Sequence, residues 1–113
     1  MSYSPSAQVK NAQRFAFALQ QTYKAAAALQ PTTEERQAWL TAVDVVDFLS
    51  DAEETNTLMD ILVGRCTISQ VLSDFADQQD EIAEEVAADD RESAEDCRRW
   101  AAQCRAAAKE LRA

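Results

Sequence analysis

Residues 67–86 read TISQVLSDFADQQDEIAEEV, and their apolar side chains recur at helical intervals. The side chains that share one predicted face are spaced four, three, four, three and four residues apart: Ile68, Leu72, Phe75, Gln79, Ile82 and Val86. The same spacing returns near the end of the chain, at Ser93, Cys97, Trp100, Cys104, Ala107 and Leu111. Because side chains three and four residues apart lie on one side of an α-helix, both segments are predicted to be amphipathic helices.

The connection between these two segments leaves two alternatives. After Gly64 the chain contains no glycine or proline, which favours a single helix of about 45 residues, about 68 Å long. Helices of that length are rare in compact domains, so we favour two helices with a break near residues 88–90. Asp89 and Glu92 are then expected to form a capping box at the start of the second helix.

Two further helical patterns occupy the first part of the chain. A helix over residues 5–29 is predicted to follow the cap residue Ser4 and to end before Pro31, whose ring disfavours helical geometry in the preceding residue. Thr32 and Glu35 match a capping box, in which each side chain accepts a hydrogen bond from a free backbone amide. A second helix is therefore expected to begin there, with apolar residues around much of its circumference.

A short third helix is predicted between this pair of helices and the later pair. Residues 50–53 match a second capping box, and the apolar residues that follow are Leu58, Ile61 and Leu62. Gly64 lies where a left-handed residue would end this helix. Thr67 is expected to cap the helix that comes next.

The composition agrees with a helical chain. Its 113 residues include one glycine and two prolines, whereas sheets and tight turns normally use many more of both. Hydrophobic residues make up 47% of the chain, and its length suits one domain. The predicted fold is all-α, a compact antiparallel bundle of four to five amphipathic helices in a single domain over residues 1–113.

The residue types that are missing argue against most enzyme classes. The chain has no histidine, which removes the usual nucleophile–histidine systems and the commonest proton shuttle. One glycine cannot form a phosphate-binding loop or a dinucleotide fingerprint. We therefore predict a non-catalytic protein without a cofactor or a metal ion.

Three cysteines, Cys66, Cys97 and Cys104, do not form a disulfide framework. Cys97 and Cys104 would lie about 10.5 Å apart on one helix, which is too far for a bond between them. They are interpreted as small buried hydrophobic residues. The first residues show no signal peptide, and no apolar run reaches the roughly 18 residues that span a bilayer. The expected location is the cytoplasm.

The charge is concentrated in one segment. The formal net charge is −9, yet residues 71–96 carry eleven acidic side chains and one arginine, a net charge of −10. Residues 97–113 carry a net charge of +4, and residues 1–30 carry +3. This balance disfavours direct nucleic-acid binding and anionic membranes, and it predicts a basic protein surface as partner.

The acidic segment has three interpretations. It can be a solvated helix face, or it can pair with the basic residues that follow it. It can also be a recognition surface, in which carboxylates compete with nucleic-acid phosphates for a basic groove. The predicted partner-binding residues are Asp74, Asp77, Asp80, Glu81, Glu84, Glu85, Asp89 and Asp90. Small acidic inhibitors from phages and mobile elements, including several anti-CRISPR proteins, use such surfaces, and this chain is similar to them in size and charge alone.

Two alternative functions follow from other features. The first is a helical homo-oligomer or adaptor that uses apolar helix faces, with an isologous homodimer interface predicted at Cys97, Trp100, Cys104 and Leu111. The second is a magnesium-dependent nucleotide pyrophosphohydrolase, because acidic pairs three residues apart share a helix face and can hold Mg²⁺. The acidic residues of this second alternative are Glu81, Glu84, Glu85, Glu92, Glu95 and Asp96.

Overall fold

The computed structural model describes the backbone of residues 5–52 and 55–112, and the side chains of residues 13–52 and 56–112. Within these residues the chain forms helices and no strand, which confirms the all-α prediction. The helices are α1 (Pro5–Ala28), α2 (Thr33–Asp51), α3 (Thr55–Leu62), α4 (Ile68–Val86) and α5 (Arg91–Glu110). The predicted cap Ser4 lies outside the described residues.

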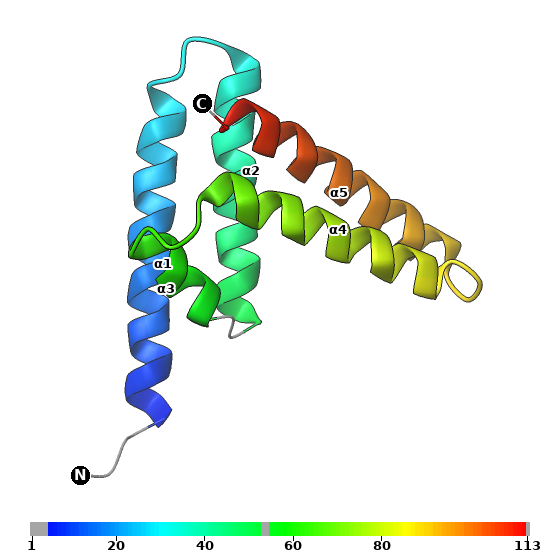
Figure 1. The fold of residues 1–113 in the computed structure, drawn as a ribbon, viewed down its shortest axis with the longest axis horizontal. Helices are drawn as coiled ribbons and strands as arrows, with labels where there is room; N and C mark the ends of the chain where they lie inside the picture. The colour runs from blue at the N-terminus through cyan, green and yellow to red at the C-terminus, as the bar shows by residue number, and fades with distance from the viewer. Residues whose placement is uncertain (1–4, 53–54, 113) are drawn as a thin grey trace.

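The helices form two antiparallel hairpins that lie across each other (Figure 1). α1 and α2 make the first hairpin, α4 and α5 make the second, and the short α3 lies beside α1. The second hairpin packs against α2 near one end, and its turn projects away from the other three helices (Figure 1). The molecule measures 49 × 40 × 20 Å, a flat shape that leaves much of the second hairpin open to solvent.

Most of the predicted helix ends are confirmed. At the start of α2 the Thr32 hydroxyl accepts a hydrogen bond from the Glu35 amide at 3.2 Å, which is one half of the predicted capping box; the return bond to the Glu35 side chain is not formed. Thr67 forms a full capping box with Gln70 at the start of α4. Gly64 has a φ of +78°, which is the left-handed conformation predicted after α3.

The structure contradicts the capping box predicted over residues 50–53, because its first two residues do not start a helix. Ser50 and Asp51 belong to the last turn of α2, so they extend that helix instead of starting another. The chain leaves helical geometry at Ala52, whose amide still bonds to the Phe48 carbonyl. Glu53, the other end of the predicted box, lies outside the described residues.

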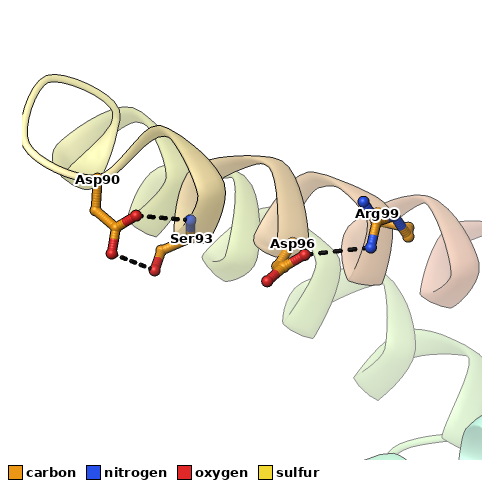
Figure 2. A network of polar contacts seen from close by, with 4 residues as sticks. All are labelled: Asp90, Ser93, Asp96 and Arg99. Carbon is orange, nitrogen blue, oxygen red and sulfur yellow. Dashed lines mark hydrogen bonds and ion pairs between the residues drawn. The ribbon is translucent and has the colours of Figure 1, made fainter.

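The break between the last two helices is confirmed, but its cap is one residue later than predicted. α4 ends at Val86 and α5 begins at Arg91. The carboxylate of Asp90, and not that of Asp89, accepts hydrogen bonds from the Ser93 amide at 3.0 Å and the Ser93 hydroxyl at 2.6 Å (Figure 2). Serine supplies this second bond, so the turn is stabilised without the predicted contribution of Glu92.

The core lies where α2 meets the other helices. Val45 and Val46 on α2 are fully buried, and so are Leu58 on α3 and Leu72 on α4. This burial agrees with the apolar circumference predicted for the second helix. Burying a side chain of this size contributes roughly 1.5–3 kcal/mol, so these residues hold α3 and the second hairpin against α2.

Buried alanines recur at seven-residue intervals on both α4 and α5. Ala76 and Ala83 are seven residues apart on α4, and Ala94, Ala101 and Ala108 follow the same interval on α5. All five are at most 2% exposed. We call this set the alanine seam. Because methyl side chains occupy little space, two helices can lie close together along such a seam.

The seam corrects the predicted inner face of α4. Ile82 was expected to face inward, yet it is 42% exposed, and Ala83 is buried in its place. Phe75 of the predicted stripe contacts Phe48 on α2 and Trp100 on α5, and the hairpin extends beyond α2 (Figure 1). Ile82 therefore lies on the projecting part, where α2 no longer covers the stripe.

Candidate functional site

The predicted partner-binding residues lie along α4 and the turn that follows it. All but one are exposed, and Asp80 is partly buried: Asp74, Asp77, Asp80, Glu81, Glu84, Glu85, Asp89 and Asp90. Three of them, Asp77, Asp80 and Asp90, make polar contacts within the chain. These contacts reduce the charge that the three carboxylates offer to a partner.

Arg105 on α5 pairs with two acids of α4. Its guanidinium donates a hydrogen bond to the Asp77 carboxylate at 3.0 Å and lies in ion-pair contact with Asp80. Hydrogen bonds to these two carboxylates, first Asp80 and then Asp77, raise the pKa of Arg105. The interpretation of internal pairing is therefore confirmed for these residues, and a surface of eight free carboxylates is not formed.

Asp90 serves the turn. The Ser93 hydroxyl and then the Ser93 amide donate hydrogen bonds to its carboxylate and lower the pKa of Asp90 (Figure 2). A carboxylate at this position also interacts favourably with the N-terminus of α5. Asp90 is exposed, but its charge is already engaged by its own helix.

Acids of α5 are also paired locally. Arg99 donates a hydrogen bond to Asp96 at 3.2 Å, one turn earlier on the same helix (Figure 2). Arg91 lies 3.9 Å from Glu95 in the same way. Such exposed pairs contribute little to stability, but they lower the net charge of this side of the hairpin.

Four of the predicted partner-binding acids that form no ion pair among the described residues lie on the last turns of α4 and on the turn that follows. They are Glu81, Glu84, Glu85 and Asp89, which we call the distal acidic surface. No lysine or arginine among the described residues lies within 4 Å of these carboxylates. Their like charges lie within one or two helical turns of each other, so the local potential is negative.

The predicted dimer interface is only partly on the surface. Cys104 is 0% exposed inside the core of its own chain, so this residue cannot be presented to a second copy and its assignment is corrected. Cys97, Trp100 and Leu111 are half-buried, and the Trp100 ring packs edge-on against Phe75 at 5.8 Å. The remaining part of the dimer interface stays a prediction.

The cysteines are not arranged for nucleophilic chemistry. Burial raises the pKa of the Cys104 thiol to about 12, with Arg105 opposing and Asp44 adding to the effect. Burial, followed by the Asp60 and Asp74 carboxylates, also raises the pKa of Cys66. Since the thiolate is the reactive form, both residues are poor nucleophiles near neutral pH. All three thiols are free, as predicted.

Two grooves lie near the junction of the hairpins. The larger, of about 690 Å³, is lined by Cys66, Thr67, Ser69, Gln70, Ser73, Asp74, Leu111 and Arg112. The smaller, of about 500 Å³, is lined by Thr33, Glu34, Gln37, Ala38, Thr41, Gln103, Ala106, Ala107, Lys109 and Glu110. Both mix polar side chains with small apolar ones.

The predicted magnesium-binding acids are not brought together. Across residues 13–52 and 56–112, no three cysteine, aspartate or glutamate side chains converge in a way that could hold a metal ion. The two acidic motifs lie on opposite sides of the turn between α4 and α5, and the second motif is partly paired with arginines of its own helix. No cluster of three such ligands among these residues supports the pyrophosphohydrolase alternative.

An exposed apolar surface was missed by the sequence reasoning. Phe48 on α2 is 49% exposed, although its ring contacts Phe75 on α4 at 5.2 Å between centroids. Ile82 is exposed one heptad further along α4. The length of the apolar stripe could have predicted this surface. The stripe on α4 is longer than the part of α4 that α2 covers.

Comparison of this chain with protein-family models, with curated proteins and with solved structures finds no match. Among the described helices, none combines the length and the apolar character needed to cross a membrane. Function is therefore inferred from the surfaces of the two hairpins alone.

Proposed function

We propose that this chain is a non-catalytic protein-binding module that presents the distal acidic surface to a basic surface of another protein. The observation that supports this proposal is the position of Glu81, Glu84, Glu85 and Asp89 on the projecting part of the second hairpin. A partner can approach these carboxylates without contacting α1 or α3. None of them forms an ion pair within the described residues, so binding need not break one.

The chemistry of the surface favours a partner that ordinarily binds nucleic acid. Carboxylates one helical turn apart resemble a row of phosphates in charge, and a basic groove attracts both. In this proposal the chain competes with nucleic acid and acts as an inhibitor. The proposed compartment is the cytoplasm, where three free thiols remain reduced.

A homo-oligomer or adaptor is the second candidate function. Large apolar side chains are exposed on the first hairpin as well, since Phe17 is 62% exposed and Leu29 is 83% exposed. Exposed apolar residues of this size are favoured at protein interfaces. In this alternative the acidic residues maintain solubility, and assembly does not weaken as the salt concentration rises.

Affinity capture with a charge-reversed variant tests the first proposal. The double variant Glu81→Lys/Glu84→Lys changes the distal acidic surface, and Glu34→Lys/Glu110→Lys makes the same change in net charge at the other end of the molecule. Proteins captured from cells of the native organism are identified by mass spectrometry. We expect basic partners that bind the native chain and the control variant but not the Glu81/Glu84 variant.

Salt dependence distinguishes the two candidate functions. Screening lengths shorten from about 14 Å to about 4 Å between roughly 0.05 M and 0.5 M salt, so a charge-driven complex should weaken steeply over this range. Partners that remain bound to the Glu81/Glu84 variant would contradict the role of this surface. Salt-insensitive self-association, detected by sedimentation, would favour the oligomer instead.

A further inference from the structure

Three aromatic rings join α2, α4 and α5 in one row. The Phe48 ring meets the edge of Phe75 at 5.2 Å, and Phe75 meets the edge of Trp100 at 5.8 Å. Phe75 is buried, Trp100 is half-buried and Phe48 is 49% exposed. The middle ring of the row is therefore in the core and both ends reach the surface, at the corner where the second hairpin leaves α2.

The apolar surface continues from this corner along the projecting hairpin. Ile82 lies seven residues after Phe75 on α4, about 10.5 Å further along the helix axis. It is 42% exposed, and no described residue covers the rest of it. Ile82 is therefore a large apolar side chain that the chain leaves partly open to solvent.

The charged neighbours of the exposed apolar residues are acidic. Asp44 and Asp51 lie four residues before and three residues after Phe48, on the same side of α2. Glu85 has the same relation to Ile82 on α4. Asp47 adds a further carboxylate next to Phe48, and burial, followed by this carboxylate, raises the pKa of Asp44. No lysine or arginine occupies these neighbouring positions.

We propose that the apolar corner, formed by Phe48, Ile82 and the exposed part of Trp100, docks an amphipathic helix of a partner protein with a basic flank. This inference rests on the proposed protein-binding function and names the chemistry of the partner. Apolar side chains about two turns apart on such a helix match the axial separation between Phe75, which underlies the corner aromatics, and Ile82. Its lysines or arginines meet Asp44, Asp51 and Glu85 at the rim.

Charge argues against a second copy of the chain as the occupant. An isologous contact through the corner would place Asp44, Asp51 and Glu85 of one copy against the same residues of the other. Each copy also carries a net charge of −9. A basic helix relieves this repulsion, whereas an identical acidic chain increases it.

Fluorescence of Trp100 provides a direct test. Trp39 packs against Tyr23 on the first hairpin, so the variant Trp39→Phe leaves Trp100 as the single tryptophan reporter. The probe is a synthetic helical peptide with leucines on one face and lysines on the other. The control peptide carries glutamates in place of the lysines. We expect the lysine peptide to shift Trp100 emission and the glutamate peptide to leave it unchanged.

Two corner variants in this background locate the binding site. Ile82→Ser and Phe48→Ser should each weaken the lysine peptide about tenfold or more. Phe17→Ser removes an aromatic residue that is even more exposed, on α1, and should leave binding unchanged. Circular dichroism identifies variants that have lost the fold. If Phe48→Ser unfolds the chain, the binding of the lysine peptide to Ile82→Ser still tests the corner.

The outcomes separate this inference from the proposed function. Loss of binding in Ile82→Ser, with binding kept in Glu81→Lys/Glu84→Lys, supports the corner. Loss in the charge variant alone overturns the corner and leaves the distal acidic surface as the binding site. Equal binding of both peptides, absence of binding, or a dimer that Ile82→Ser dissociates in sedimentation would each overturn the inference.

Discussion

The Ser69 hydroxyl on α4 donates a hydrogen bond of 2.7 Å to the Ala108 backbone carbonyl on α5, and both residues are buried. Ala108 lies in the last turn of α5, where helix carbonyls lack an amide partner in their own helix. The bond therefore satisfies a buried carbonyl and joins the start of α4 to the end of α5. The turn at Asp90 joins the same two helices at the opposite end of the hairpin.

Replacing Ser69 by alanine should destabilise the fold. The Ala108 carbonyl would stay buried without its donor, at a cost of about 1–3 kcal/mol in the free energy of unfolding. Urea titration followed by circular dichroism measures this change. Ser73→Ala, a hydroxyl removed one turn later on the same helix, serves as the control and should change stability by less than about 0.5 kcal/mol. Equal effects of the two substitutions would show that the bond contributes nothing.

Gly64→Ala should cost about 1 kcal/mol of stability, because the backbone there has a φ of +78° that a Cβ atom disfavours. An added Cβ would meet no atom within 4 Å, so the cost comes from the backbone and not from a clash. Gly64→Asn should be the milder substitution, since asparagine tolerates left-handed geometry. Thermal melting of the three proteins gives this order, and an alanine variant as stable as the asparagine one would contradict it.

Alkaline pH should destabilise the protein through Cys104. Burial raises the pKa of this thiol from its ordinary value near 9 to about 12, so the unfolded chain releases the proton first as the pH rises. Stability should then fall from about pH 9 upward, with Cys104 contributing up to about 1.4 kcal/mol per pH unit. Urea titrations at pH 8 to 11 measure the slope, which should be shallower in Cys104→Ala. Tyr23, whose pKa burial also raises to about 12, remains in both proteins.

Acid pH should remove the contribution of Asp90. Its pKa is lower in the folded protein than in the unfolded chain, so its stabilising effect is present above the ordinary aspartate pKa and is lost as the pH falls through the lowered value. Asp90→Asn keeps a good cap but does not titrate. The native chain should therefore be the more stable at pH 7, and the difference should shrink toward pH 2. A constant difference across this range would indicate that the Asp90 charge has no role.

Local signals predicted the helices well. Thr67 and Gly64 mark their helix ends through interactions with residues near in sequence, and such interactions can be read without a fold. The break before α5 was also predicted, but its cap moved from Asp89 to Asp90 because Ser93 provides a second hydrogen bond. Asp89 and Asp90 are the same residue type, so the sequence does not distinguish them. The geometry of the turn determines which one caps α5.

Contacts between helices were harder to predict. The seven-residue interval between Phe75 and Ile82 indicated that both belong to one buried stripe. Where the hairpins cross, Phe75 is buried, but Ile82 lies beyond the crossing and is partly exposed. The pairing of Arg105 with Asp77 depends on how α4 and α5 are aligned, which the sequence does not state directly. The predicted acidic surface was therefore too large, since part of its charge is neutralised across the hairpin.

The alanine seam separates the frame of the second hairpin from its outer side chains. Any residue larger than alanine at Ala83 or Ala101 would wedge the two helices apart and tilt the projecting end. The exposed positions of α4 and α5 carry no such restriction. Substitutions there can change the surface charge without moving the backbone. Over evolutionary time the acidic side chains of the hairpin can thus change while five methyl groups preserve its shape.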